Sequence, residues 1–399
     1  MNRPVSPTMD RGTEDPSWYR VQTSEEPSIN RQRAGEARWR SIDALRGFNM
    51  LWIMGVNTLI YKLHEIYATP LTALLDHHMR HPQWDEGFTF YDLIWPLFLF
   101  IVGTVIPASL ERRKEQGQSA KQIYFYIARR TLVVFFVGVL MTGPLTYDLS
   151  RVFEVSLTAP APDWWGVLQR IAVCYFLAAV LVIHTGWRTQ VVISAAILLG
   201  YWAALMLLEI GGMGPGVSSR HDCWVYAFGL RDNFVTTPLS LPSVLLGVWA
   251  GEWLRSRHSE QRRIAGLILM GVALLAVAYI WALWFPMIKR IWSSTYVVYA
   301  GGWSLLLLAL FHWLIDVKGY KKWAFFLIVI GMNAIPIYFL TNSPYNVVDF
   351  EGIAGLFLQG LMDLAGVVTA RPVVLIAGAL VVKWLFLWFL YRHKLFFRA

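Results

Sequence analysis

The chain has 399 residues, of which 56% are hydrophobic and 15% charged, and its mean hydropathy is +0.46. This composition excludes an ordinary soluble protein and is typical of a polytopic membrane protein. Two cysteines exclude a disulfide framework, a Cys-rich zinc site and an iron–sulfur site. The net charge of +9 is explained by cytoplasmic loops rich in Lys and Arg, so we exclude nucleic acid as a partner.

The first forty residues differ from the rest of the chain. Residues 1–40 contain no apolar run and are rich in Arg, Glu, Pro and Ser. Without an apolar h-region they do not form a signal peptide, and their composition is typical of disorder. We therefore expect a disordered cytoplasmic tail over residues 1–40 and a single transmembrane domain over residues 41–399.

Apolar runs long enough to cross about 30 Å of hydrocarbon recur after the tail. Ten of them are expected to be transmembrane helices: residues 44–61, 88–110, 124–145, 164–184, 191–210, 239–254, 264–285, 294–315, 323–341 and 373–391. An eleventh segment, residues 353–368, contains Gln359 and Asp363, which favours an external amphipathic or re-entrant helix. The predicted fold is an all-α bundle of about ten transmembrane helices.

The Lys and Arg residues are distributed unequally between the loops. With ten spans and a cytoplasmic N-terminus, 25 of the 35 lie on the cytoplasmic side and eight on the external side. Cytoplasmic loops carry the excess of positive charge in membrane proteins, so this arrangement predicts that both termini are inside. An eleven-span arrangement would place Arg392, Lys394 and Arg398 outside, which the same rule disfavours.

Few polar residues are expected within the membrane, and each is a functional candidate because burying it in hydrocarbon is costly. Asn57 lies at the outer end of the first span and Asp92 at the start of the second. An alternative role for Asp92 is that of a helix N-cap. Arg170 is either a ligand-binding residue or a cation that snorkels to the interface. Asn333 is either a ligand contact or an interhelical hydrogen-bonding residue.

Four of the nine histidines lie in the loop between the first two spans: His64, His77, His78 and His81. Two imidazoles one helical turn apart suit zinc, but no HExxH motif, Cys or placed carboxylate completes a site, so we expect no metal. Solvated loop histidines are a second interpretation. The third makes one histidine a general base or acyl acceptor, with Asp92 orienting the ring and Asn57 donating a hydrogen bond.

The cytoplasmic end of the first span carries a second candidate site. Asp43 and Arg46 lie one helical turn apart, a spacing that favours a structural ion pair. The alternative is that Arg40 and Arg46 line a mouth for a polyanionic ligand such as a nucleotide or coenzyme A. Four further arginines would join them: Arg112, Arg113, Arg129 and Arg130.

Five segments in order resemble the membrane family of heparan-alpha-glucosaminide N-acetyltransferase and its bacterial relatives. They are RSIDALRGFNMLWIMGVN, HPQWDEGFTFYDLIWPLFLFIVG, GVLQRIAVCYF, FPMIKRIWSSTYVVYAGG and WAFFLIVIGMNAIPIYFL. The resemblance implies transfer of acetyl from cytosolic acetyl-CoA to a glucosamine amine across the membrane, through an essential His. The match places that His on His81 and the family's Asn on Asn57. It places four further motif residues on Trp84, Gly87, Thr89 and Asp92.

The resemblance implies a membrane-embedded acyltransferase of the bacterial inner membrane. Acetyl-CoA is the implied co-substrate, its phosphates held by Arg40 and Arg46, with Arg170 and Asn333 as further candidate contacts. The other partners are a saccharide amine acceptor and the lipid bilayer, and a homodimer is compatible with the sequence. The alternative function is secondary transport of an amino sugar, with Asp92 and the histidines as a proton relay.

Overall fold

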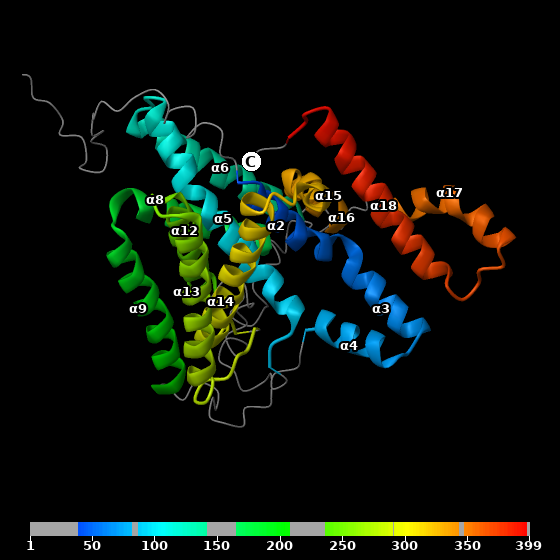
Figure 1. Ribbon diagram of the computed structural model, residues 1–399, viewed down its shortest axis with the longest axis horizontal. Coiled ribbons are helices and arrows are strands. Elements are labelled where there is room, and N and C mark those ends of the chain that lie inside the picture. The colour runs from blue at the N-terminus through cyan, green and yellow to red at the C-terminus, as the bar shows by residue number, and fades with distance from the viewer. Residues whose placement is uncertain are drawn as a thin grey trace, which may run out of the picture.

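The computed structural model describes residues 39–81, 87–141, 165–207, 236–289, 291–342 and 347–396. Every regular element within these ranges is a helix (Figure 1). The all-α class of the polytopic membrane protein predicted from the sequence is confirmed. The first helix begins at Arg40, and residues 1–38 of the predicted tail lie outside the described residues.

The helices follow the predicted segments closely. In the first half of the chain they are α2 (Arg40–Leu51), the π-helix η2 (Trp52–Val56), α3 (Asn57–Ile66), α4 (Pro70–Met79), α5 (Phe90–Glu115), α6 (Ala120–Met141), α8 (Val167–His184) and α9 (Trp187–Leu207). In the second half they are α12 (Thr237–Arg255), α13 (Glu260–Trp281), α14 (Ser294–Phe311), the π-helix η3 (His312–Val317), α15 (Lys321–Met332), α16 (Ala334–Asn342), α17 (Phe350–Leu364) and α18 (Arg371–Arg392).

Seven of the described helices are long and apolar enough to cross a membrane: α5, α6, α8, α9, α13, α14 with η3, and α18. The pair α15 and α16, bent by 65°, makes an eighth if it is one span. The predicted first span coincides with α2, η2 and α3, where the π-helix interrupts the run. The predicted sixth coincides with α12, whose many buried residues face protein rather than lipid. The count of ten and the orientation stay predictions.

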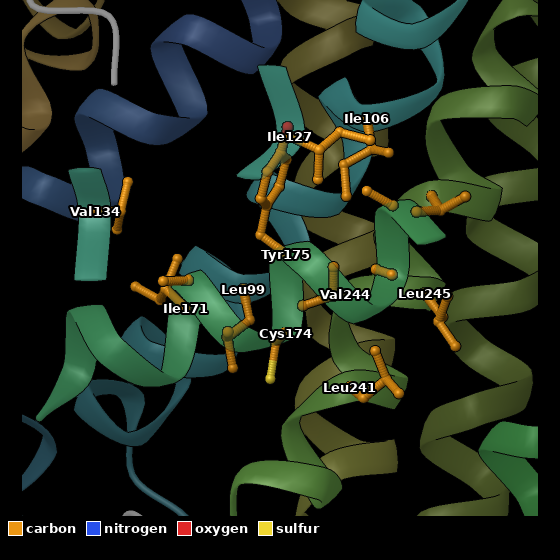
Figure 2. Packing of buried hydrophobic residues seen from close by; sticks show 14 of the residues in the cluster. Leu99, Ile106, Ile127, Val134, Ile171, Cys174, Tyr175, Leu241, Val244 and Leu245 are labelled. Carbon is orange, nitrogen blue, oxygen red and sulfur yellow. The ribbon is translucent and has the colours of Figure 1, made fainter. Parts of the chain in front are cut away.

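Helices α5 and α12 pack closely at the centre of the bundle. A Cβ atom at Gly247 would lie closer than 3.0 Å to the Phe100 carbonyl oxygen, and one at Gly103 equally close to that of Val244. Small residues of this kind let two helix backbones approach, as is common in membrane interiors. Figure 2 shows part of the apolar cluster that surrounds this contact, in which α8 contributes Ile171 and α5 contributes Leu99. The middle of α5 is thereby packed directly against the backbone of α12.

The first predicted span is bent where α2 passes through η2 into α3. Gly55 has φ of 132°, a value that only glycine adopts readily. The Met54 carbonyl oxygen accepts a hydrogen bond from Lys383 Nζ of α18 at 2.7 Å. Figure 1 shows α3, α4, α17 and α18 on one side of the bundle and α9 and α13 on the other. The predicted helix at 353–368 is present as α17, and its external position stays a prediction.

Candidate active site

Asp92 lies in the first turn of α5 and is almost fully buried, with 1% of its surface exposed. Its Oδ2 atom accepts hydrogen bonds from the backbone N–H of Thr89 at 3.3 Å and from the Thr89 hydroxyl at 3.2 Å. Thr89 is the N-cap residue of α5, so Asp92 does contribute to the helix start, as one sequence interpretation predicted. The other carboxylate oxygen remains available for a second partner.

That partner is His81. Its Nδ1 atom lies 2.8 Å from Asp92 Oδ1, and 48% of the His81 side chain is exposed. The backbone beside it is fixed, because the Thr89 hydroxyl donates to the Arg80 carbonyl oxygen at 2.9 Å. Arg80 also donates to both carboxylate oxygens of Asp76 at 2.6 and 2.9 Å, and this ion pair raises the pKa of the Arg80 guanidinium. The structure therefore brings a solvent-facing imidazole against a buried carboxylate.

Asn57 reaches this pair through Tyr91. The Asn57 amide donates to the Tyr91 hydroxyl at 3.1 Å, and the centre of the Tyr91 ring lies 5.1 Å from that of His81. The hydrogen bond expected from Asn57 to the acyl oxygen stays a prediction. Asn57 orients the tyrosine that forms one wall beside the imidazole.

Lys289, which the sequence did not single out, is the third member of the cluster. Its Nζ atom lies 2.9 Å from His81 Nδ1, 3.2 Å from His81 Nε2 and 3.2 Å from Asp92 Oδ1. Burial lowers the pKa of the Lys289 ammonium, and the Asp92 carboxylate offsets part of that shift. The sequence feature that could have identified Lys289 is its place in the string FPMIKRIWSSTYVVYAGG, just before a predicted span.

Arg170 lies in the adjoining interior rather than at the membrane interface. Its side chain is 1% exposed, and its guanidinium lies 4.7 Å from the Trp95 ring centre and 4.5 Å from that of Trp292. It also donates to the Thr236 hydroxyl. The interpretation of Arg170 as a snorkelling cation is therefore wrong, because α5 and α12 enclose the charged head. Its predicted contact with a cofactor stays a prediction.

A small apolar cavity lies close to Arg170. Ile53 of η2, Trp95 of α5, Ile171 of α8 and Tyr338 of α16 are among its lining residues. Asn333 lies at the bend between α15 and α16, near one end of α16, and is buried. Residues of η2 and α16 line the cavity, together with Trp95, which follows Asp92 by one turn of α5.

The remaining candidates lie apart from the cluster. Arg46 forms an ion pair with Asp43 at 3.6 Å, which agrees with the structural alternative, and Arg40 is exposed. His77 and His78 are exposed on α4, with their ring centres 5.4 Å apart. Among the described residues, no group of three or more His, Cys, Asp or Glu side chains is arranged to hold a metal ion. Trp84, from the quoted motif, lies outside the described residues.

The fold and the cluster define a polytopic helical membrane protein with a His–Asp–Lys arrangement at the start of a central helix. The family described as Domain of unknown function (DUF5009) matches residues 38–156. The chain is 24% identical over 386 residues to heparan-alpha-glucosaminide N-acetyltransferase of Homo sapiens, covering 78% of this chain and 54% of that protein. The same enzyme of Mus musculus is 24% identical over 380 residues, with 77% and 54% covered.

The resemblance predicted from the five motifs is confirmed by these comparisons. The chain spans about half the length of the curated relatives it matches. The similarity extends over most of this chain.

Proposed function

We propose that this protein is a membrane-embedded acyltransferase that moves an acetyl group from acetyl-CoA to the amine of an amino sugar of the glucosamine type. The observation that supports it most is the 2.8 Å contact between His81 Nδ1 and Asp92 Oδ1, in a chain similar to two N-acetyltransferases. A carboxylate that accepts from one ring nitrogen leaves the other free to take a proton.

In this proposal His81 is the general base. Its exposed face meets the acceptor amine and removes a proton as the nitrogen attacks the thioester carbonyl, because amide formation releases one proton. Asp92 fixes the tautomer, and Asn57 holds Tyr91 against the ring. The thioester is already reactive, so positioning the two substrates supplies much of the remaining rate.

The donor would enter from the cytoplasm, and both termini would be cytoplasmic. Arg40 and Arg46 at the inner end of α2 would meet its phosphates, because guanidinium groups bind phosphate bidentately. Its acyl arm would pass between the helices toward His81, with Arg170 and the buried Asn333 as further contacts. The membrane would be the bacterial inner membrane, in which acetyl-CoA is available on one side only.

Purified protein in liposomes tests the function. Radiolabelled acetyl-CoA and glucosamine should yield labelled N-acetylglucosamine and free CoA in equal amounts. Accumulation of glucosamine inside the vesicles without CoA release would contradict the enzyme and favour a transporter.

Three histidine variants test the assignment of the base. His81→Ala is expected to lower the transfer rate by about 10²- to 10⁴-fold. His77→Ala and His78→Ala are the matched controls, because both residues are exposed on α4 and neither ring contacts Asp92. Equal loss in all three variants, together with inhibition by a chelator, would replace the base with a metal site.

A further inference from the structure

The Lys289 ammonium contacts both members of the His–Asp pair rather than the carboxylate alone. Its Nζ atom lies within 3.2 Å of both His81 ring nitrogens and of Asp92 Oδ1. We propose that Lys289 is a catalytic residue that gives a proton to the departing CoA thiolate and regains one from His81. This inference rests on the proposed acetyl transfer, and it assigns the leaving-group side of that reaction.

The loop between α13 and α14 holds Lys289 in place. Trp292 has φ of 54°, an uncommon conformation for a bulky residue, which persists where the surrounding contacts fix it. The Trp292 N–H donates to the Lys289 carbonyl oxygen at 2.9 Å, and the Ser293 N–H donates to that of Ile288 at 3.0 Å. The Ile288 N–H donates in turn to the Ser293 hydroxyl at 3.0 Å. Lys289 is therefore positioned by folded backbone, with 22% of its side chain exposed.

The charges of the cluster limit how many protons it holds. Asp92 supplies one negative charge, and an ammonium and an imidazolium 2.9 Å apart would repel each other strongly. In the proposed starting form, Lys289 holds the transferable proton and His81 Nε2 is free to accept one. That form already contains both groups the reaction needs, a base for the amine and an acid for the thiolate.

The reaction then balances within the cluster. The acceptor nitrogen bonds to the acetyl carbonyl carbon, and the carbonyl electron pair moves to oxygen, next to the Lys289 ammonium. His81 takes the proton from that nitrogen. The carbonyl re-forms, the C–S bond breaks with its electron pair on sulfur, and Lys289 gives its proton to the thiolate. The Nε2–H of the His81 imidazolium returns its proton to the Lys289 amine across their 3.2 Å contact, which restores the resting tautomer with Nδ1–H on Asp92.

Two substitutions of Lys289 distinguish the effect of its positive charge from the effect of proton transfer through its amine. Lys289→Met removes both, whereas Lys289→Arg keeps the charge beside Asp92 but cannot release a proton, because a guanidinium stays protonated in proteins. We expect both variants to lower kcat by about 10²- to 10⁴-fold with little change in KM for acetyl-CoA. Lys62→Met is the matched control, because Lys62 is an exposed lysine whose described ion pair is with Glu65 of the same helix.

The pH dependence of kcat provides a readout that a structural role would not change. Wild-type kcat should fall at alkaline pH as Lys289 loses its proton, and both variants should lack this limb. A wild-type profile that stays flat up to about pH 10, near the ordinary lysine pKa, would overturn the inference without any variant. Thermal unfolding of the purified proteins shows which variants are folded.

The outcomes distinguish this inference from the proposed function. A wild-type protein that releases no CoA overturns both. If the wild type is active and Lys289→Met keeps kcat within threefold, the inference fails and the acetyl transfer stands. If Lys289→Arg alone recovers wild-type kcat, charge is sufficient and the proton exchange is overturned. Low kcat in both folded variants, with loss of the alkaline limb, supports the inference.

Discussion

Replacing Asp92 with Asn would remove the negative charge of the cluster while keeping the shape of the side chain. In the wild-type site Oδ1 lies 2.8 Å from His81 Nδ1 and 3.2 Å from Lys289 Nζ, and Oδ2 accepts twice from Thr89. A carboxylate only accepts hydrogen bonds, whereas an amide has one accepting oxygen and an NH₂ group that only donates. The amide therefore satisfies Thr89 or the His81–Lys289 side, but not both.

We expect Asp92→Asn to impair catalysis strongly while it destabilises the fold only moderately. If the amide oxygen stays on the Thr89 N–H, the NH₂ group faces His81 Nδ1 and forces the ring proton onto Nε2. The nitrogen that faces the acceptor can then no longer take a proton, an effect that costs about 10⁴-fold in another His–Asp pair. We expect Asp92→Asn to lower kcat by about 10³- to 10⁴-fold. The free energy of unfolding should fall by only about 1–3 kcal/mol, the cost of leaving a buried donor unsatisfied.

Thr89→Ala is the matched control, measured with the same acetyl-transfer assay and the same thermal unfolding. It removes the hydroxyl contacts to Asp92 and to the Arg80 carbonyl oxygen but keeps the carboxylate beside His81. We expect a loss of about 1 kcal/mol in stability, as for other N-cap residues, and kcat within about tenfold of wild type. If both variants lose the same activity, and the loss matches the fraction of protein that is unfolded, Asp92 acts only as a helix cap.

Three further outcomes follow from the packing, the charges and the topology. Gly247→Ala should lower the free energy of unfolding by about 1–3 kcal/mol, because its Cβ would meet the backbone of α5. Gly200→Ala, with no atom within 4 Å, should change thermal unfolding little, and equal effects would contradict the close helix contact. Because burial lowers the Lys289 pKa, its neutral fraction is raised at every pH below the ordinary lysine value. An amine-acylating reagent, read by peptide mass spectrometry, should therefore label Lys289 at lower pH than an ordinary lysine amine. If the labelling of Lys289 has the same pH dependence as that of an ordinary lysine, burial does not lower its pKa. A reporter active only outside the cytoplasm should stay silent when fused after Ala399, whereas strong activity would show an odd number of spans.

The amino-acid sequence by itself determined the helical class and the positions of most of the described helices. Hydrophobic runs of membrane length are local signals, because each span satisfies its own backbone hydrogen bonds within one segment. The family resemblance placed the essential histidine on His81, close to Asp92 in the chain. Eleven residues separate His81 from Asp92, and the loop that carries the histidine returns to the start of the next helix.

Only the tertiary structure decided which distant residues complete the cluster. Lys289 lies 208 residues after His81, and its place before a predicted span does not by itself indicate that it contacts the histidine. The same holds for Arg170, whose polarity suggested an interface but whose ring contacts with Trp95 and Trp292 place it inside the bundle. Whether a charged side chain such as Arg170 or Lys289 is enclosed by the bundle depends on two features. One is the close approach of α5 to α12, and the other is the fold of the loop after α13. Both arise from contacts between segments that periodicity along a single segment does not encode.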